Sequence, residues 1–124
     1  MNVNDINHSW GKMRSLFFVP AHVEKFYKKA IASEADVIVF DLEDGAPSSK
    51  KEEARHNTGR YLGSDRNGKK LLVRVNPLGS RYHDTDLLAC VKAGADGIVL
   101  PKTRSAKDVS DVLDAILKVL EEQS

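Results

Sequence analysis

Three acidic residues directly follow an apolar stretch of the chain. Residues 37–40 are β-favouring and apolar, Asp41, Glu43 and Asp44 come next, and a Gly/Pro turn at residues 45–47 ends the segment. In α/β proteins a buried strand reads as a continuous apolar run, and ligands bind at the carboxyl ends of such strands. Carboxylates placed there lose hydration unless they meet a cation, a hydrogen-bond donor or water. We therefore predict that this segment forms one wall of an active site.

Several kinds of chemistry suit these acidic side chains. Asp41, Glu43 and Asp44 could ligate a hard cation such as Mg²⁺, orient a metal-bound water, or transfer protons. Asp41 and Glu43 share a face only if the strand stays regular as far as Glu43. The alternative is an acidic loop whose carboxylates accept hydrogen bonds from nearby backbone N–H groups.

Arg74 lies in another apolar run, between Val73 and Val75, and is followed by Asn76 and Pro77. Its guanidinium stays protonated, and its planar fork matches a carboxylate or a phosphate. Near the carboxyl end of a strand it would point into the same cleft. A structural ion pair with one of the acidic residues is the alternative. The two interpretations overlap, because an acidic cluster can hold an arginine ready for a substrate.

The lysines and the cysteine give weaker signals. Lys25 and Lys29 lie four residues apart and so share one face of a predicted helix, where they could bind phosphates or form a solvated face. Lys102 follows Pro101, and nothing in the sequence would depress its pKa for Schiff-base chemistry, so we interpret it as a surface lysine. Cys90 lies among apolar residues at helical spacing, which indicates a buried structural thiol.

The elements that must position these residues repeat as strand then helix, four times. Strands are predicted at residues 16–19, 37–42, 71–75 and 97–100. Helical periodicity follows each of them, at residues 23–31, 49–62, 84–93 and 105–120. Ser49 and Glu52 form a capping-box signature, Asp84 is a candidate cap of the third helix, and Ser105 starts the fourth.

The pattern leaves two architectures open. The turns from helix to strand are short, whereas the loops from strand to helix carry the polar residues. This asymmetry favours a parallel sheet with its site at the carboxyl ends of the strands. Four βα units could form a small open sheet with helices on both faces. Alternatively, they are half of a (β/α)8 barrel, which usually needs about 250 residues.

Composition limits the classes of function. The 124 residues suffice for a single domain, 1–124, in which we expect residues 1–12 to be flexible or peripheral. A net charge of +1 gives no electrostatic argument for nucleic acid or an acidic membrane. No apolar run approaches the roughly 18 residues of a membrane span. The lone cysteine excludes an internal disulfide and favours a reducing, cytoplasmic setting.

Four motifs in order make the chain resemble a known family. They are R-S-L-F-F-V-P, D-L-E-D-G, V-R-V-N-P-L and L-P-K, at residues 14–20, 41–45, 73–78 and 100–102. Over about residues 13–120 the chain resembles the citrate lyase β-subunit-like branch of the HpcH/HpaI aldolase superfamily. The resemblance implies a TIM barrel, of which this chain is the N-terminal half, assembled into trimers or hexamers.

The same resemblance implies a reaction. It is a Mg²⁺-dependent cleavage or formation of a carbon–carbon bond in acyl-thioesters such as citryl-CoA or malyl-CoA, and some members hydrolyse the thioester. The metal would hold a 2-oxo acid and stabilise an enolate. By position, Arg74 matches the arginine that binds the substrate carboxylate, and Phe18 matches a residue that touches the substrate. Lys25 and Lys29 match lysines that contact the CoA phosphates in some relatives.

We expect residues 1–124 to contain only part of the metal site. Glu43 and Asp44 match an acidic pair beside the metal, acting through water or other ligands, and with Arg74 they are the candidate catalytic residues. The direct Mg²⁺ ligands, a glutamate and an aspartate, are expected beyond Ser124. Ala21 and His22 depart from the family pattern, which has glycine then asparagine or aspartate after the first strand's proline.

Three hypotheses about function follow. The first is a lyase of acyl-thioesters, inactive as these 124 residues alone. The second is a non-catalytic half-barrel that serves as a binding or assembly module. The third is an aldolase of free hydroxy-oxo acids. Sequence beyond Ser124 that carries an acidic metal pair would favour the first hypothesis over the second.

Overall fold

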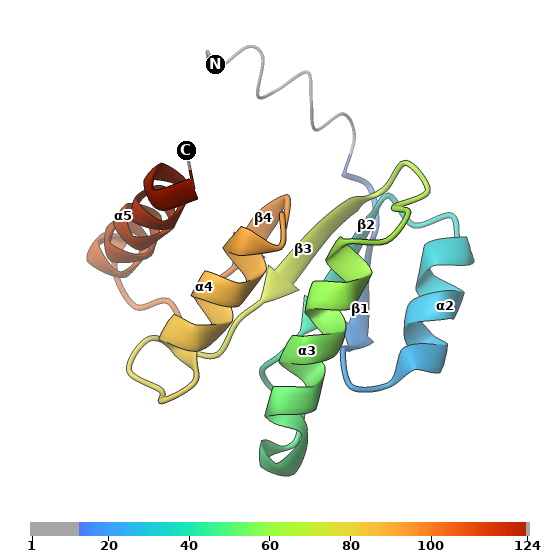
Figure 1. Cartoon of the computed structure of the whole chain (residues 1–124), viewed down its shortest axis with the longest axis horizontal. Helices are drawn as coiled ribbons and strands as arrows, with labels where there is room; N and C mark the ends of the chain where they lie inside the picture. The colour runs from blue at the N-terminus through green and yellow to red at the C-terminus, as the bar shows by residue number, and fades with distance from the viewer. Residues whose placement is uncertain (1–12, 124) are drawn as a thin grey trace.

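The computed structural model describes residues 13–123, in which four parallel strands alternate with four helices (Figure 1). The strands are β1 (Leu16–Pro20), β2 (Val37–Asp41), β3 (Lys70–Arg74) and β4 (Gly97–Val99). The helices are α2 (Glu24–Ala32), α3 (Lys51–Leu62), α4 (His83–Lys92) and α5 (Ala106–Gln123), and a 3₁₀ turn, η1 (Ser48–Lys50), precedes α3. Residues 1–12, for which we expected a flexible or peripheral segment, lie outside the described residues.

The order of the strands decides between the two architectures. It is β1-β2-β3-β4, so each new strand is added on the same side of the previous one. Right-handed crossovers in one direction keep every helix on one face of the sheet. A doubly wound sheet would reverse its strand order at a switch point. The arrangement is therefore that of a barrel segment, and the alternative of an open sheet with helices on both faces was wrong.

The two faces of the sheet differ in what covers them. One face packs against α2, α3 and α4, where Tyr27 and Tyr61 stack with ring centroids 3.9 Å apart. Burying each large apolar side chain there contributes about 1.5–3 kcal/mol. The strand residues of this core are Val19, Ile38, Phe40, Leu71 and Val73. The other face carries a small cluster of strand residues, and no described helix contributes to it: Val37, Val39, Leu72 and Val99.

The start of α3 differs from the prediction. Ser49 and Glu52 do not form a capping box, because Ser49 falls inside the 3₁₀ turn and α3 begins at Lys51, with no side-chain cap on either element. Pro47 starts this turn, and its carbonyl accepts the Lys50 N–H at 2.8 Å. A backbone carbonyl thus satisfies one of the N–H donors at the start of this helical segment.

The residues at the start of α4 and α5, and at the end of α4, can be compared with the prediction. Asp84 was predicted as a cap but lies within the first turn of α4, after the N-cap Tyr82, where its charge suits the positive end of the helix dipole. Gly94 follows α4 with a φ of 90°, a left-handed conformation typical of helix ends. Helix α5 begins at Ala106, within one residue of the predicted start at Ser105, and Ser105 Oγ accepts the N–H of Asp108 at 3.4 Å.

Helix α5 presents more apolar surface than its neighbours cover. Val112 and Val119 are buried with Leu87 and Val91 of α4. Beside them runs a stripe of half-exposed side chains, which we call the α5 stripe: Val109, Leu113, Leu117 and Leu120. The sequence had predicted one apolar side, and α4 covers only part of it. Within residues 13–123, no helix is long and apolar enough to cross a bilayer.

Cys90 is buried in the core at 1% exposure, as predicted for a structural thiol. Burial, with a smaller contribution from the charge of Asp86, raises the pKa of the thiol to about 12. Because the thiolate is the nucleophile, Cys90 is expected to resist iodoacetamide at pH 8 in the folded protein and to react after unfolding in guanidinium. Mass spectrometry of the alkylated protein checks this, and rapid labelling of the folded form would contradict it.

Candidate active site

Arg74 and Asp41 face each other where β3 and β2 end, because the strand register pairs these two residues. Arg74 Nε donates to Asp41 Oδ1 at 2.9 Å and Nη2 donates to Oδ2 at 2.6 Å. This is the bidentate geometry that makes arginine–carboxylate pairs both strong and directional. Arg74 Cζ also lies 5.1 Å from the ring centroid of Phe18, a cation–π contact. Three neighbouring strands thus contribute to one surface.

The chain turns sharply after β2 and brings Glu43 back toward Arg74. Asp41 Oδ1 accepts the N–H of Glu43 and Oδ2 accepts that of Gly45, both at 2.9 Å, which makes a side-chain-stabilised turn. A Cβ at Gly45 would lie 2.7 Å from Asp41 Oδ2, so only glycine fits. Glu43 Oε1 consequently lies 3.7 Å from Arg74 Nε, although β2 ends at Asp41.

One oxygen of Glu43 is poorly satisfied. The side chain is 6% exposed, and Oε2 is buried without a hydrogen-bond partner in the described structure. Lys102 Nζ approaches Oε2 to 3.3 Å as an ion pair, while the Lys102 side chain stays 64% exposed. We had interpreted Lys102 as a surface lysine and missed this contact. The available signal was its position just after β4, in the same loop layer as Glu43.

Asp44 is exposed and contributes to the site through its charge. Hydrogen bonding to Asp41, together with the charges of Asp41, Glu43 and Asp44, raises the pKa of Arg74 above its ordinary value. The guanidinium therefore stays charged at every physiological pH. A permanent cation beside a buried carboxylate oxygen can bind a substrate carboxylate and present an acceptor to the same ligand.

The Asp41–Arg74 pair predicts an acid-dependent stability. Burial raises the pKa of Asp41, but hydrogen bonds from Arg74 and from the Glu43 and Gly45 N–H groups outweigh it, and the pKa lies below its ordinary value. The ionised form therefore stabilises the fold above about pH 4, and this contribution is lost as the pH falls through the lowered pKa. We expect the melting temperature to fall between pH 5 and pH 2.

Part of that fall should be absent in Asp41→Asn, which has no carboxylate to protonate at this position. Circular dichroism melts at stepped pH measure it, with Asp44→Asn as the control because Asp44 is exposed. Asp44→Asn is expected to keep the wild-type dependence. An Asp41→Asn variant with the full wild-type dependence would show that the pair does not link folding to protonation.

The two predicted phosphate-binding lysines lie apart from this cluster. Lys25 and Lys29 are exposed on α2, and Lys25 Nζ lies 5.2 Å from the ring of Phe26. No described contact of residues 13–123 joins either lysine to Arg74 or Glu43. Lys25 is near the start of α2, at the end of the sheet that carries the site, whereas Lys29 lies in the last turn.

The described acids do not form a complete metal site. Within residues 13–123, no three His, Cys, Asp or Glu side chains come close enough together to hold a metal ion. Both oxygens of Asp41 already bind Arg74. Glu43 Oε2, in contrast, can accept a hydrogen bond from a metal-bound water. A position of Glu43 and Asp44 beside a Mg²⁺ ion, without direct ligation, stays a prediction.

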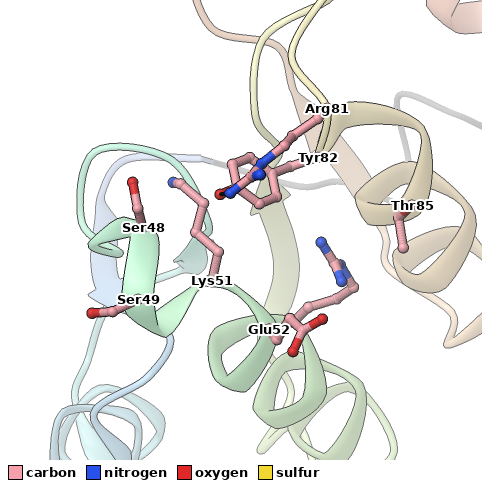
Figure 2. Close-up of a pocket in the computed structure, with 8 residues that line it drawn as sticks. Ser48, Ser49, Lys51, Glu52, Arg81, Tyr82 and Thr85 are labelled. Carbon is pink, nitrogen blue, oxygen red and sulfur yellow. Dashed lines mark hydrogen bonds between the residues drawn. The ribbon is translucent and has the colours of Figure 1, made fainter.

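A separate cavity of about 460 Å³ lies next to the β2–α3 loop. Figure 2 shows Lys51 reaching from the start of α3 toward Ser48 and the ring of Tyr82. Neither Arg74 nor Glu43 lines this cavity. Lys51 Nζ instead donates to the backbone carbonyls of the loop that carries Glu43. Sequence reasoning missed Lys51, because carbonyl partners leave no side-chain pattern to read.

The chain is similar in sequence and in fold to several known proteins. The chain is 34% identical over 110 residues to a (3S)-malyl-CoA thioesterase of Cereibacter sphaeroides, covering 88% of this chain and 39% of the relative. It is 37% identical over 110 residues to citrate lyase subunit beta of Escherichia coli, covering 86% and 35%. The fold is similar to the citrate lyase beta subunit from M. tuberculosis complexed with oxaloacetate and magnesium, with a TM-score of 0.72, 29% identity and coverage of 86% and 46%.

The chain thus spans less than half the length of these relatives. Residues 14–123 match the family model of HpcH/HpaI aldolase/citrate lyase, from the start of the first strand unit to the end of α5. The match includes all four strands and the residues that meet at the strand ends, Phe18, Asp41, Glu43 and Arg74, which we call the Arg74 cluster. The chain belongs to the HpcH/HpaI aldolase/citrate lyase family.

Proposed function

We propose that this protein takes part in a Mg²⁺-dependent reaction that breaks or forms a carbon–carbon bond in CoA thioesters of the citryl-CoA or malyl-CoA type. The observation that carries the proposal is the Arg74 cluster. A guanidinium has five N–H donors, and Asp41 takes two of them, so three have no hydrogen-bond partner among residues 13–123 and can serve a ligand. The named relatives, a citrate lyase subunit and a malyl-CoA thioesterase, support this class of substrate.

Each residue of the cluster has a proposed role. Arg74 binds the carboxylate of the substrate, because Asp41 orients its fork and Phe18 supports its plane. Glu43, with Asp44 nearby, accepts a hydrogen bond at the reacting end of the ligand through Oε2, which has an ion pair with Lys102 but no hydrogen-bond partner among the described residues. Bound Mg²⁺ would supply Lewis-acid polarisation of a substrate oxygen. We propose that its direct ligands lie outside the described residues.

The test is a turnover assay on the full-length gene product. Malyl-CoA and citryl-CoA are each incubated with Mg²⁺, and products are separated by chromatography. We expect the thioester to be consumed with Mg²⁺ and to persist after EDTA treatment. Acetyl-CoA as product would indicate carbon–carbon cleavage, and free CoA with malate or citrate, according to the substrate, would indicate hydrolysis. Residues 1–124 alone are expected to bind oxaloacetate weakly and to turn nothing over.

Two results would overturn the proposal. One is that neither thioester is consumed and oxaloacetate does not bind in calorimetry. The other is turnover of free hydroxy-oxo acids with no effect of the CoA group, which would favour an aldolase instead. Scaffold-like pairing with a longer homologue, in the absence of any turnover, would favour the binding-module hypothesis.

Lys25 is proposed to contact the phosphates of CoA, and Lys29 to assist it. Lys25→Ala is expected to weaken CoA binding about two- to fivefold at low salt, because an exposed ionic contact contributes at most about 1 kcal/mol. The effect should shrink at 300 mM KCl, since salt screens exposed charges. Calorimetric titration with CoA at both salt concentrations measures it, with Lys28→Ala as the control. An equal loss of CoA affinity at both salt concentrations would indicate that Lys25 acts through packing instead.

We also propose an oligomeric state, a cellular compartment and a class of ligand for the protein. The α5 stripe supports a homo-oligomer, because contiguous exposed apolar surface commonly marks an interaction site. The buried free thiol of Cys90 and the near-neutral net charge support a cytoplasmic protein that works on small molecules rather than nucleic acid or membranes.

A further inference from the structure

We propose that Lys51 is a positioning residue that holds the β2–α3 loop so that the Glu43 carboxylate faces Arg74. Lys51 is the first residue of α3, and its Nζ donates to the carbonyl oxygens of Leu42 and Glu43 at 2.9 Å and of Ala46 at 3.0 Å. An ammonium has three N–H donors, and all three are used here. The catalytic consequence rests on the proposed function, whereas the effect on the loop does not.

The three carbonyls belong to the segment that carries the site. One carbonyl belongs to Glu43 itself, and another belongs to Leu42, which directly precedes it. The N–H of Leu42 donates to the carbonyl of Arg74 at 2.9 Å, which ties the ends of β2 and β3 together. Lys51 therefore acts at the point where the backbone fixes Glu43 relative to Arg74.

A second brace reaches the same carbonyl. Asn76 Nδ2 donates to Leu42 O at 3.0 Å and to Asp86 Oδ2 at 2.6 Å. Asp86 is almost fully buried and also accepts from the Asn76 N–H at 3.0 Å and from Arg55 Nε at 2.9 Å. Helices α3 and α4 thus hold the loop from two sides, and Lys51 supplies the contacts that reach beyond Leu42.

Lys50 provides a matched comparison on the same chain. It precedes Lys51, its side chain is half exposed, and its described ion pair joins it to Glu53 at 3.2 Å on the surface. Lys51, in contrast, is half-buried beside the ring of Tyr82 at the wall of the 460 Å³ cavity. Figure 2 shows the extended side chain of Lys51 in this position. An ammonium that leaves water for three carbonyls makes charge-assisted bonds, which are stronger than neutral ones.

Removing Lys51 should release the loop without displacing Arg74. The three carbonyls would lose their donor, and Glu43 would sample other orientations. Arg74 would stay in place because Asp41 on the strand still holds its fork. Binding of the substrate carboxylate should therefore change little, and the step that depends on Glu43 should slow. KM is expected to stay near wild type while kcat falls.

Amide hydrogen exchange tests the loop independently of activity. In Lys51→Met, the amides of Gly45 and Ala46 are expected to exchange about 10- to 100-fold faster, the size of effect that lost charge-assisted hydrogen bonds produce. The amide of Val73 in the core should keep its wild-type rate, which confirms folding. Lys50→Met should leave all these rates unchanged. Unchanged loop exchange in Lys51→Met would overturn the proposal.

If Lys51→Met does not fold, Lys51→Gln takes its place, because glutamine keeps two N–H donors for the three carbonyls. A smaller increase in exchange at Gly45 and Ala46 is then expected. Wild-type exchange at these amides in a folded Lys51→Gln protein would equally overturn the proposal.

A double-mutant cycle tests the positioning role on full-length protein. Lys51→Met is expected to lower kcat about tenfold in the wild-type background and to have no further effect in Glu43→Gln, because neighbours that act through each other are non-additive. An equal loss in both backgrounds would show a general structural effect and overturn the positioning role. Absence of wild-type turnover would instead count against the proposed function, and the exchange experiment would still decide the role of Lys51 in the loop.

Discussion

Arg74→Ala is expected to lower turnover of the CoA thioester by several orders of magnitude. The substrate carboxylate would lose a bidentate cationic partner, and truncating one member of a buried charged pair commonly costs about 3–5 kcal/mol. Each 1.4 kcal/mol of transition-state stabilisation corresponds to about tenfold in rate. The Asp41 carboxylate, whose side chain is 7% exposed, would also be left without its main partner, so a lower melting temperature should accompany the loss. Steady-state kcat/KM and thermal melts measure the two effects.

Two controls separate the role of Arg74 from charge in general. Arg74→Lys keeps the cation but cannot engage Asp41 with a planar fork, so an intermediate loss is expected. Arg81→Ala removes an exposed arginine of the β3–α4 loop and should leave turnover near wild type. Near-wild-type turnover in Arg74→Ala would refute the assignment of the substrate carboxylate to this residue.

Asp86→Ala is expected to produce the largest loss of stability. Its carboxylate is 1% exposed and accepts hydrogen bonds from Arg55 and from both the backbone and the side chain of Asn76. Removing one partner of a buried ion pair costs about 3–5 kcal/mol, because the remaining charge stays buried and unpaired. The free energy of unfolding, extrapolated from urea titrations, should fall by that amount.

Asp84→Ala is the matched control for Asp86→Ala. Asp84 lies in the same turn of α4 but is exposed, so its loss should cost less than about 1 kcal/mol through the helix dipole. The two variants should share an m-value, which reports the surface exposed on unfolding. Equal midpoints for both would show that the buried network contributes nothing beyond the helix dipole.

Much of the fold was accessible to sequence reasoning. The apolar runs at residues 37–42 and 71–75 identified β2 and β3 to within one residue, because buried parallel strands leave a continuous apolar signature. The arrangement of the helices around the sheet was not accessible, since the direction of each crossover depends on tertiary packing. The start of α3 was misjudged because Pro47 favours a local backbone turn over a side-chain cap.

The site was accessible where it depends on strand ends. Glu43 lies two residues after β2 and Arg74 is the last residue of the adjacent parallel strand β3, and the structure places their charged groups 3.7 Å apart. The reason that Glu43 faces Arg74 was not readable, because it lies in the Asp41 turn rather than in strand alternation. Lys51 was invisible for another reason: its partners are main-chain oxygens, which every residue possesses. The contact between Lys102 and Glu43 could not be predicted without knowing how β4 pairs with β3.

The consecutive pairing of the strands has a consequence for how the molecule forms. Among residues 13–123, each strand pairs only with strands adjacent to it in the chain, so every pairing closes a loop of one helix and its connections. The entropy lost on closing a loop grows with its length, and short closures make folding fast. The polypeptide can therefore gain order unit by unit during synthesis, with each paired strand and its helix providing an edge for the next strand, before its last residues leave the ribosome.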